Sequence, residues 1–149
     1  MDEEAGRGSI IAQVQGELLT LSRRGTARAR EAYASLSLVD QSLVTYIGTN
    51  PGCRNVDIAA HFQLNKSTVS RQLSTLIDLG FIESHAIEGR GQALTLTAKG
   101  SELQQRLSEE VLAALTTRFA SWPEDDIRTF AILLERFNSG SGDAGGLSR

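Results

Sequence analysis

The stretch NKSTVSRQLSTLIDLGFIE, residues 65–83, decides the fold of this 149-residue chain. Its apolar residues fall on one side of a helical wheel, which predicts a helix with a buried stripe. Asn65 is a suitable N-cap for this helix, and Gly80 is a suitable residue to end it. The polar side could be ordinary solvated surface or a binding face. The stripe consists of Val69, Leu73, Leu76 and Ile77.

The polar side of this helix has an unusual composition. Its first two turns carry short hydroxyl side chains, one Arg and one Gln, where solvated helices usually carry Glu, Lys and Ala. Hydroxyl groups bond phosphates and base edges, Arg pairs with guanine, and Gln pairs with adenine. A DNA-reading face is one interpretation, and a solvated face is the other. The candidate major-groove residues are Lys66, Ser67, Thr68, Ser70, Arg71 and Gln72.

The segments around this helix predict its context. A helix is expected to start at the N-cap Ser37, with Asp40 in the capping-box position. A short helix follows in NVDIAAHFQL, with Asn55 as a candidate cap. After the opening stretch, residues 81–97 alternate apolar and polar around the turn EGRGQ, which predicts a β-hairpin. Helix, turn, helix and hairpin in this order form the winged helix–turn–helix plan.

The predicted hairpin tip places a cation, Arg90, between Gly89 and Gly91. Glycine lets the backbone turn tightly and approach a partner closely. An exposed Arg on a thin hairpin suits a DNA minor groove or a phosphate. The alternative is an ordinary β-turn with a solvated Arg.

The two ends of the chain complete the plan. Residues 9–30 have helical apolar spacing, a long helix is expected from Thr97, and SWPEDD predicts the start of a last helix. Residues 1–9 and the Gly/Ser-rich tail 139–149 are predicted to be disordered. The fold class expected is mainly α with a small β-hairpin wing.

Composition narrows the function further. Apolar residues make up 40% of the chain, and no apolar run reaches membrane-spanning length. The polar, acidic N-terminus predicts no secretory signal, and the single cysteine favours a reducing cytoplasm. Net charge is −3, so any affinity for phosphate depends on where the cations are placed. Residues 41–100 hold five Lys/Arg and four acids and are the only third that is not net negative.

The segment DIAAHFQLNKSTVSRQLSTLIDLGFIESH, followed by EGRGQALTLTAKG, resembles the recognition helix and wing of the MarR family of bacterial transcriptional regulators. LSLVDQSLVTYI and WPEDDIRTFAILLERF are similar to the family's flanking patterns. The resemblance covers residues 10–138. It implies a winged helix–turn–helix lobe at 37–100 and dimerisation helices at 10–36 and 101–138.

The resemblance implies a function and a set of partners. Family members are homodimers that bind a pseudo-palindromic operator in double-stranded DNA, and most are repressors. Many release DNA when a small aromatic or anionic effector binds. Arg90 takes the place of the family's wing Arg, with Gln92 beside it, and Glu88 replaces the Asp that supports this Arg. Arg54 stands where a capping Ser or Thr is usual, which makes it a candidate phosphate contact and shifts the cap to Asn55.

Other chemistry is weakly indicated. Cys53 is the only candidate for redox sensing, and a buried structural thiol is the alternative. His61 and His85 are far apart in sequence and predict no metal site. Tyr33 and Tyr46 are candidates for an effector pocket, or else packing residues at the dimer seam. No catalytic pairing or cofactor motif is visible, so we expect no enzyme. The main competing function is a winged-helix protein-interaction module.

Overall fold

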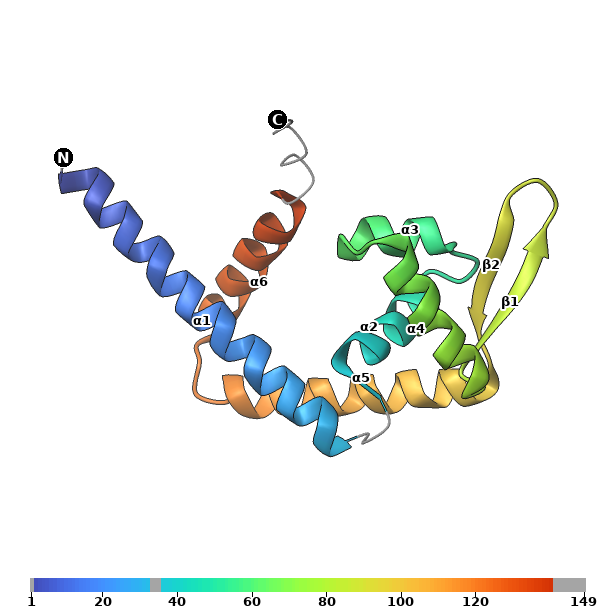
Figure 1. The fold of residues 1–149 in the computed structure, drawn as a ribbon. Coiled ribbons are helices and arrows are strands. Elements are labelled where there is room, and N and C mark those ends of the chain that lie inside the picture. Colours follow the sequence, from blue (N-terminus) through green and yellow to red (C-terminus); the bar gives the residue numbers. More distant parts are fainter. Residues whose placement is uncertain (1, 33–35, 141–149) are drawn as a thin grey trace, which may run out of the picture. The chain divides into compact units, whose positions relative to one another are not determined.

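The computed structural model describes residues 2–32 and 36–140 (Figure 1). The chain divides into two compact units, residues 1–107 and 108–149. The order of elements confirms the predicted plan of helices with one hairpin. The elements are α1 (Asp2–Ala32), α2 (Leu38–Thr49), α3 (Asn55–Phe62), α4 (Lys66–Asp78), β1 (Ile82–Ile87), β2 (Gly91–Leu96), α5 (Ala98–Phe119) and α6 (Glu124–Ser139).

The predicted caps of α2 and α4 are confirmed. The Ser37 backbone N–H donates to the Asp40 carboxylate at 2.9 Å, and the Asp40 N–H donates back to the Ser37 hydroxyl at 3.1 Å. The Asn65 side-chain oxygen accepts from the Thr68 N–H at 2.8 Å. Gly80 follows α4 with φ +79°, a conformation that favours glycine. Local hydrogen bonding therefore sets the starts of α2 and α4.

The expected cap of α3 is wrong. Arg54 is the N-cap, and Asn55 is the first helical residue. The reason is Asp57, whose carboxylate accepts from the Arg54 backbone N–H at 2.8 Å and so satisfies the start of the helix from within. At its other end α3 closes on Gln63, which adopts φ +53°. This leaves the Asn55 side chain free for another role.

The wing is an antiparallel hairpin in which Ile82 pairs with Leu96 and Ile87 with Gly91. Gly89 and Gly91 adopt φ +71° and +84°, so the turn requires glycine at both positions. Cys53 forms an isolated antiparallel bridge with Leu94, where the Leu94 N–H donates to the Cys53 carbonyl at 2.9 Å. The segment before α3 is thus attached to the wing.

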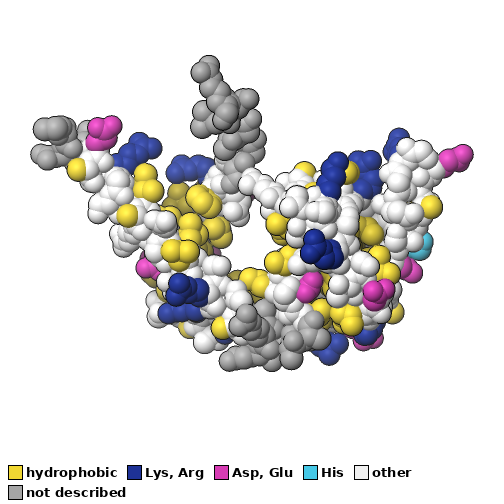
Figure 2. All heavy atoms as spheres, viewed as in Figure 1, with side chains coloured by type: hydrophobic (Ala, Val, Ile, Leu, Met, Phe, Trp, Pro, Cys, Tyr) yellow, Lys and Arg dark blue, Asp and Glu magenta, His cyan; other side chains and the backbone are white. Residues whose placement is uncertain are grey.

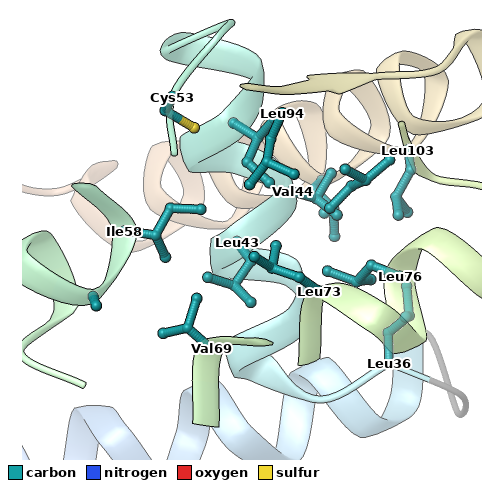
Figure 3. Close-up of a cluster of buried hydrophobic side chains, with 14 residues drawn as sticks. Leu36, Leu43, Val44, Cys53, Ile58, Val69, Leu73, Leu76, Leu94 and Leu103 are labelled. Atoms are coloured by element: carbon teal, nitrogen blue, oxygen red, sulfur yellow. The ribbon is translucent and has the colours of Figure 1, made fainter. Parts of the chain in front are cut away.

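One core holds the winged lobe together. Side chains from α2, α3, α4, the hairpin and the start of α5 meet in it (Figure 3). The predicted stripe of α4 is confirmed except at Ile77, which is 39% exposed. Ile77 lies one position beyond the buried face and borders a groove beside the wing. The fully enclosed large residues are Leu43, Val44, Ile47, Ile58, Val69, Leu76, Ile82 and Leu103.

A compact joint connects the wing to α5. The Thr97 hydroxyl donates to the Gly80 carbonyl at 2.6 Å and accepts from the Gly100 N–H at 3.1 Å. A Cβ built on Gly100 would lie 2.0 Å from the Phe81 carbonyl oxygen. The Lys99 ammonium donates to the Leu79 carbonyl at 2.7 Å. This joint gives a physical reason for a Thr and a Gly three residues apart after the wing.

The terminal helices differ from the lobe. α1 begins at Asp2, so residues 2–9, which were predicted to be disordered, are helical: Glu4, Ala5 and Arg7 are strong helix formers that offset the neighbouring glycines. α6 likewise extends to Ser139, and the predicted tail beyond residue 140 lies outside the described residues. α6 buries no residue. Figure 2 shows hydrophobic side chains on the visible surface of α1.

No helix in the described part of the chain is long and apolar enough to cross a membrane.

Candidate nucleic-acid interface

The outer face of α4 carries the candidate DNA contacts. Ser67, Ser70 and Arg71 are exposed, as is Lys66. Thr68 is half-buried on the flank of the helix. Because these exposed residues lie on the first two turns, the N-terminal half of α4 is open to a partner. Figure 2 shows basic side chains on the surface of the winged lobe.

Gln72 differs from the other candidates. It is half-buried, and its side-chain oxygen is fully enclosed without a hydrogen-bond partner among the described residues. A bidentate contact with adenine needs both amide atoms in the groove. In this conformation Gln72 presents at most its amino group, so reading adenine would require a different rotamer. Its role as a base contact stays a prediction.

A groove of about 430 Å³ separates the outer flank of α4 from the wing. Leu73, Ile77 and Leu94 contribute apolar surface to it, and two cations, Arg54 and Arg90, line it as well. Ser70, Ser74, Ser84 and Gln92 add polar groups. The structure therefore brings four predicted residues, Arg54, Ser70, Arg90 and Gln92, to one hollow, whereas the other predicted α4 residues do not line it.

The wing tip presents Arg90 as an exposed cation. Its backbone N–H closes the turn on the Ile87 carbonyl at 3.0 Å. Among the described residues, no ion pair joins Arg90 to Glu88, so the supporting role expected for Glu88 is not seen in this conformation. Gln92 accepts a hydrogen bond from the Ser84 hydroxyl at 2.7 Å. The hairpin thus holds Gln92, while Arg90 is exposed at the turn and lines the groove.

Arg54 lies at the start of α3 with its guanidinium 3.4 Å from the Asp57 carboxylate. Hydrogen bonds from the Arg54 backbone and side chain lower the pKa of Asp57. The Arg54 side chain is partly exposed, and it borders the groove opposite Ser70 and Ser74. An anion that binds Arg54 must compete with Asp57. Arg54 is therefore a weaker candidate for a phosphate contact.

Cys53 is buried in the lobe core. Burial, with a smaller contribution from the negative charge of Asp57, raises the pKa of its thiol. A thiolate is the form that peroxide attacks, and a raised pKa disfavours it. The geometry therefore favours the structural interpretation of Cys53 over redox sensing.

The remaining candidates fall outside this face. Tyr46 is half-buried and stacks on His61 at 4.5 Å and Phe62 at 5.6 Å between ring centroids. Tyr46, on α2, therefore packs against α3. Tyr33, the other candidate pocket residue, lies outside the described residues. His85 is exposed on β1. Across the described residues, no group of three potential ligands could hold a metal ion.

Two residues that support the interface, Asn55 and Thr97, were not predicted from the sequence to do so. The Asn55 amide donates to the Ser70 hydroxyl at 2.5 Å, joining α3 to α4 across fifteen residues. Thr97 caps α5 and holds the end of α4. The Thr-x-x-Gly spacing signalled Thr97, whereas nothing local in the sequence pairs Asn55 with Ser70.

Comparison with known proteins supports the fold. Residues 42–86 match the IclR helix–turn–helix domain. The HTH-type transcriptional regulator BilQ of Clostridium symbiosum (strain WAL-14163) is 38% identical over 61 residues, which cover 40% of this chain and 42% of that protein. This alignment spans less than half of the relative.

Solved structures cover far more of the chain. Streptococcus pneumoniae FabT in complex with DNA matches with a TM-score of 0.76 and 17% identity, covering 89% of this chain and 98% of that one. A MarR protein from Peptoclostridium difficile DA00132 matches with a TM-score of 0.75 and 20% identity, covering 90% and 88%. The chain therefore has the winged helix–turn–helix fold of MarR-type regulators, and the resemblance predicted from its sequence is confirmed at the level of the fold.

Proposed function

We propose that this protein is a sequence-specific DNA-binding transcriptional regulator of the MarR family. One observation carries the proposal: the outer face of α4 presents Ser67, Ser70 and Arg71 beside a wing whose tip presents Arg90. Hydroxyls and a guanidinium on the first turns of a second helix suit the major groove, and a cation on the wing suits the adjacent minor groove. The matching helix–turn–helix domain and the fold support it.

The same proposal includes a homodimer. Apolar side chains on α1, α5 and α6 are widely exposed in the single chain, and surfaces of this kind mark interaction sites. A second copy would cover them if residues 10–36 and 101–138 are dimerisation helices and 37–100 the DNA-binding lobe. Two-fold symmetry then places the two α4 helices about 34 Å apart, on half-sites one turn apart in a pseudo-palindromic operator.

The finer parts of the proposal rest on the family resemblance. We expect repression in the bacterial cytoplasm, and release of DNA by a small aromatic or anionic effector. We expect no catalytic activity and no cofactor. The competing function, a winged-helix module that binds protein instead of DNA, is motivated by the net charge of −3.

Selection of bound fragments from genomic DNA tests the proposal and identifies an operator. On that operator, Arg71→Ala should weaken binding by about 1–3 kcal/mol and relax base preference at one position in each half-site. Arg106→Ala, a change of equal charge on α5, serves as the control and should leave base preference intact. Failure to enrich any fragment would favour the protein-interaction module.

A further inference from the structure

The Ser67 and Ser70 hydroxyls on the outer face of α4 are held in opposite ways. The Ser67 hydroxyl donates its proton to the Asn65 side-chain oxygen at 2.8 Å. The Ser70 hydroxyl oxygen instead accepts from the Asn55 side-chain amide at 2.5 Å. An amide N–H₂ group has donors and no acceptor, so this contact cannot run the other way. Asn55 therefore fixes which part of the Ser70 hydroxyl remains available.

The Ser70 proton has no acceptor among the described residues. Serine and threonine in helices often donate to the carbonyl four residues earlier, as Ser42 and Thr75 do here. Ser70 makes no such bond, and it is exposed on the wall of the groove beside the wing. Its O–H therefore remains available to an acceptor in the groove outside α4.

Asn55 itself is badly placed to read DNA. It is half-buried, and its side-chain oxygen is enclosed and unpartnered within the described part of the chain. Reading adenine requires both the oxygen and the nitrogen of an amide. The Asn55 amide oxygen faces the interior, so any influence on DNA passes through its nitrogen and Ser70.

We propose that Asn55 is a positioning residue that sets Ser70 as a hydrogen-bond donor toward DNA. The inference rests on the proposed function. The acceptor on DNA would be a phosphate oxygen or a base-edge atom such as guanine O6 or N7, or thymine O4. The start of α3 would thus set the hydrogen-bonding polarity of α4.

A double-mutant cycle tests the coupling. The probe is a set of duplexes with a randomised core of about three helical turns, enriched on the parent protein. Asn55→Ala should weaken binding of the enriched duplex about 3- to 10-fold in the parent. In the Ser70→Ala background the same change should leave binding within about twofold, because its only route to DNA is gone. Ser67→Ala serves as the matched background, in which the full Asn55 effect should persist.

A second pair of variants separates orientation from stability. Asn55→Asp replaces the donor with a carboxylate that accepts the Ser70 proton. An acid at the start of α3 suits the helix dipole, and thermal unfolding of this variant measures whether the fold is retained. Val56→Asp adds the same charge at an exposed neighbour that makes no bond to Ser70. The fold loss of DNA affinity in Asn55→Asp is divided by the fold loss in Val56→Asp. The resulting ratio should be at least as large as the fold loss in Ser70→Ala.

The outcomes are distinct. Coupling to Ser70 but not to Ser67, with unchanged thermal unfolding of the Asp variants, supports the inference. Equal losses from Asn55→Ala in all three backgrounds, or equal losses from Asn55→Asp and Val56→Asp, overturn it while leaving the proposed function standing. Absence of any enriched duplex rejects the proposed function, and the inference with it.

Discussion

Helices α4 and α6 are both amphipathic, but α4 buries its apolar face whereas α6 leaves its apolar face exposed. Val69 and Leu76 of α4 are completely buried in the lobe core, whereas Phe130 and Ile132 of α6 are 41% and 59% exposed. An apolar helix face gains stability only when another surface covers it. The lobe completes its core within one chain. α6, much of α1 and the C-terminal half of α5 leave apolar side chains exposed.

This difference separates two kinds of stability. The lobe should unfold as a unit whose stability is independent of protein concentration. The terminal helices should gain stability from a second copy, so that their order rises with concentration. Substitutions in the lobe and in the terminal helices should therefore differ in how their effects depend on protein concentration.

The largest effect is expected in the lobe core. Leu76→Ala should lower the free energy of unfolding by about 2–5 kcal/mol, because Leu76 is fully enclosed and its loss leaves a cavity. Leu112→Ala, at a residue 66% exposed on α5, should change the unfolding midpoint only in a concentration-dependent way. Urea denaturation at several protein concentrations measures both. Equal, concentration-independent losses would remove the distinction between the two regions.

The next effect concerns the joint between wing and α5. Gly100→Ala should destabilise the lobe by about 1–3 kcal/mol, since its Cβ would collide with the Phe81 backbone. The control is Gly48→Ala on α2, where the added Cβ meets the end of the Gln104 side chain, which can rotate away. Thermal unfolding should show a clear drop for the first variant and little for the second. A tolerated Gly100→Ala would mean that the joint is not closely packed.

A smaller effect is expected at the exposed surface of α6. Leu133→Lys should weaken self-association about 10- to 100-fold, because it places a charge on the face proposed to pack against a second copy. Sedimentation velocity over a dilution series gives the dissociation constant. Arg128→Lys on the same helix keeps the charge and should associate like the parent. A parent protein that is monomeric at all concentrations would refute the proposed dimer.

The smallest effect is expected at Cys53. Burial raises the pKa of its thiol, so at pH 7 the folded protein holds it protonated, and reactivity should appear only as pH rises above the ordinary thiol range. Iodoacetamide should therefore label the folded protein more slowly than the urea-unfolded protein. Cys53→Ser should leave DNA affinity within about twofold with or without peroxide. Peroxide-induced release of DNA by the parent protein that Cys53→Ser abolishes would instead establish a redox switch.

The sequence predicted local features well and contacts between segments poorly. Asn65 and Ser37 were identified as caps because capping depends on residues three positions apart. Arg54 was misjudged because Asp57 satisfies the helix start in place of a side-chain cap. Ile77 was assigned to the core because a wheel does not show how far the covering surface extends. The Asn55–Ser70 bond depends on how α3 crosses α4, which no local pattern encodes.

The salt dependence of affinity for the enriched operator tests whether the α4 and wing surface binds DNA. We expect the logarithm of the association constant to fall linearly with the logarithm of salt concentration, and Arg90→Ala to flatten this slope by about one unit. Arg128→Ala on α6 should leave the slope unchanged. A parent protein whose binding is weak, independent of salt and equal for all duplexes would contradict the claim.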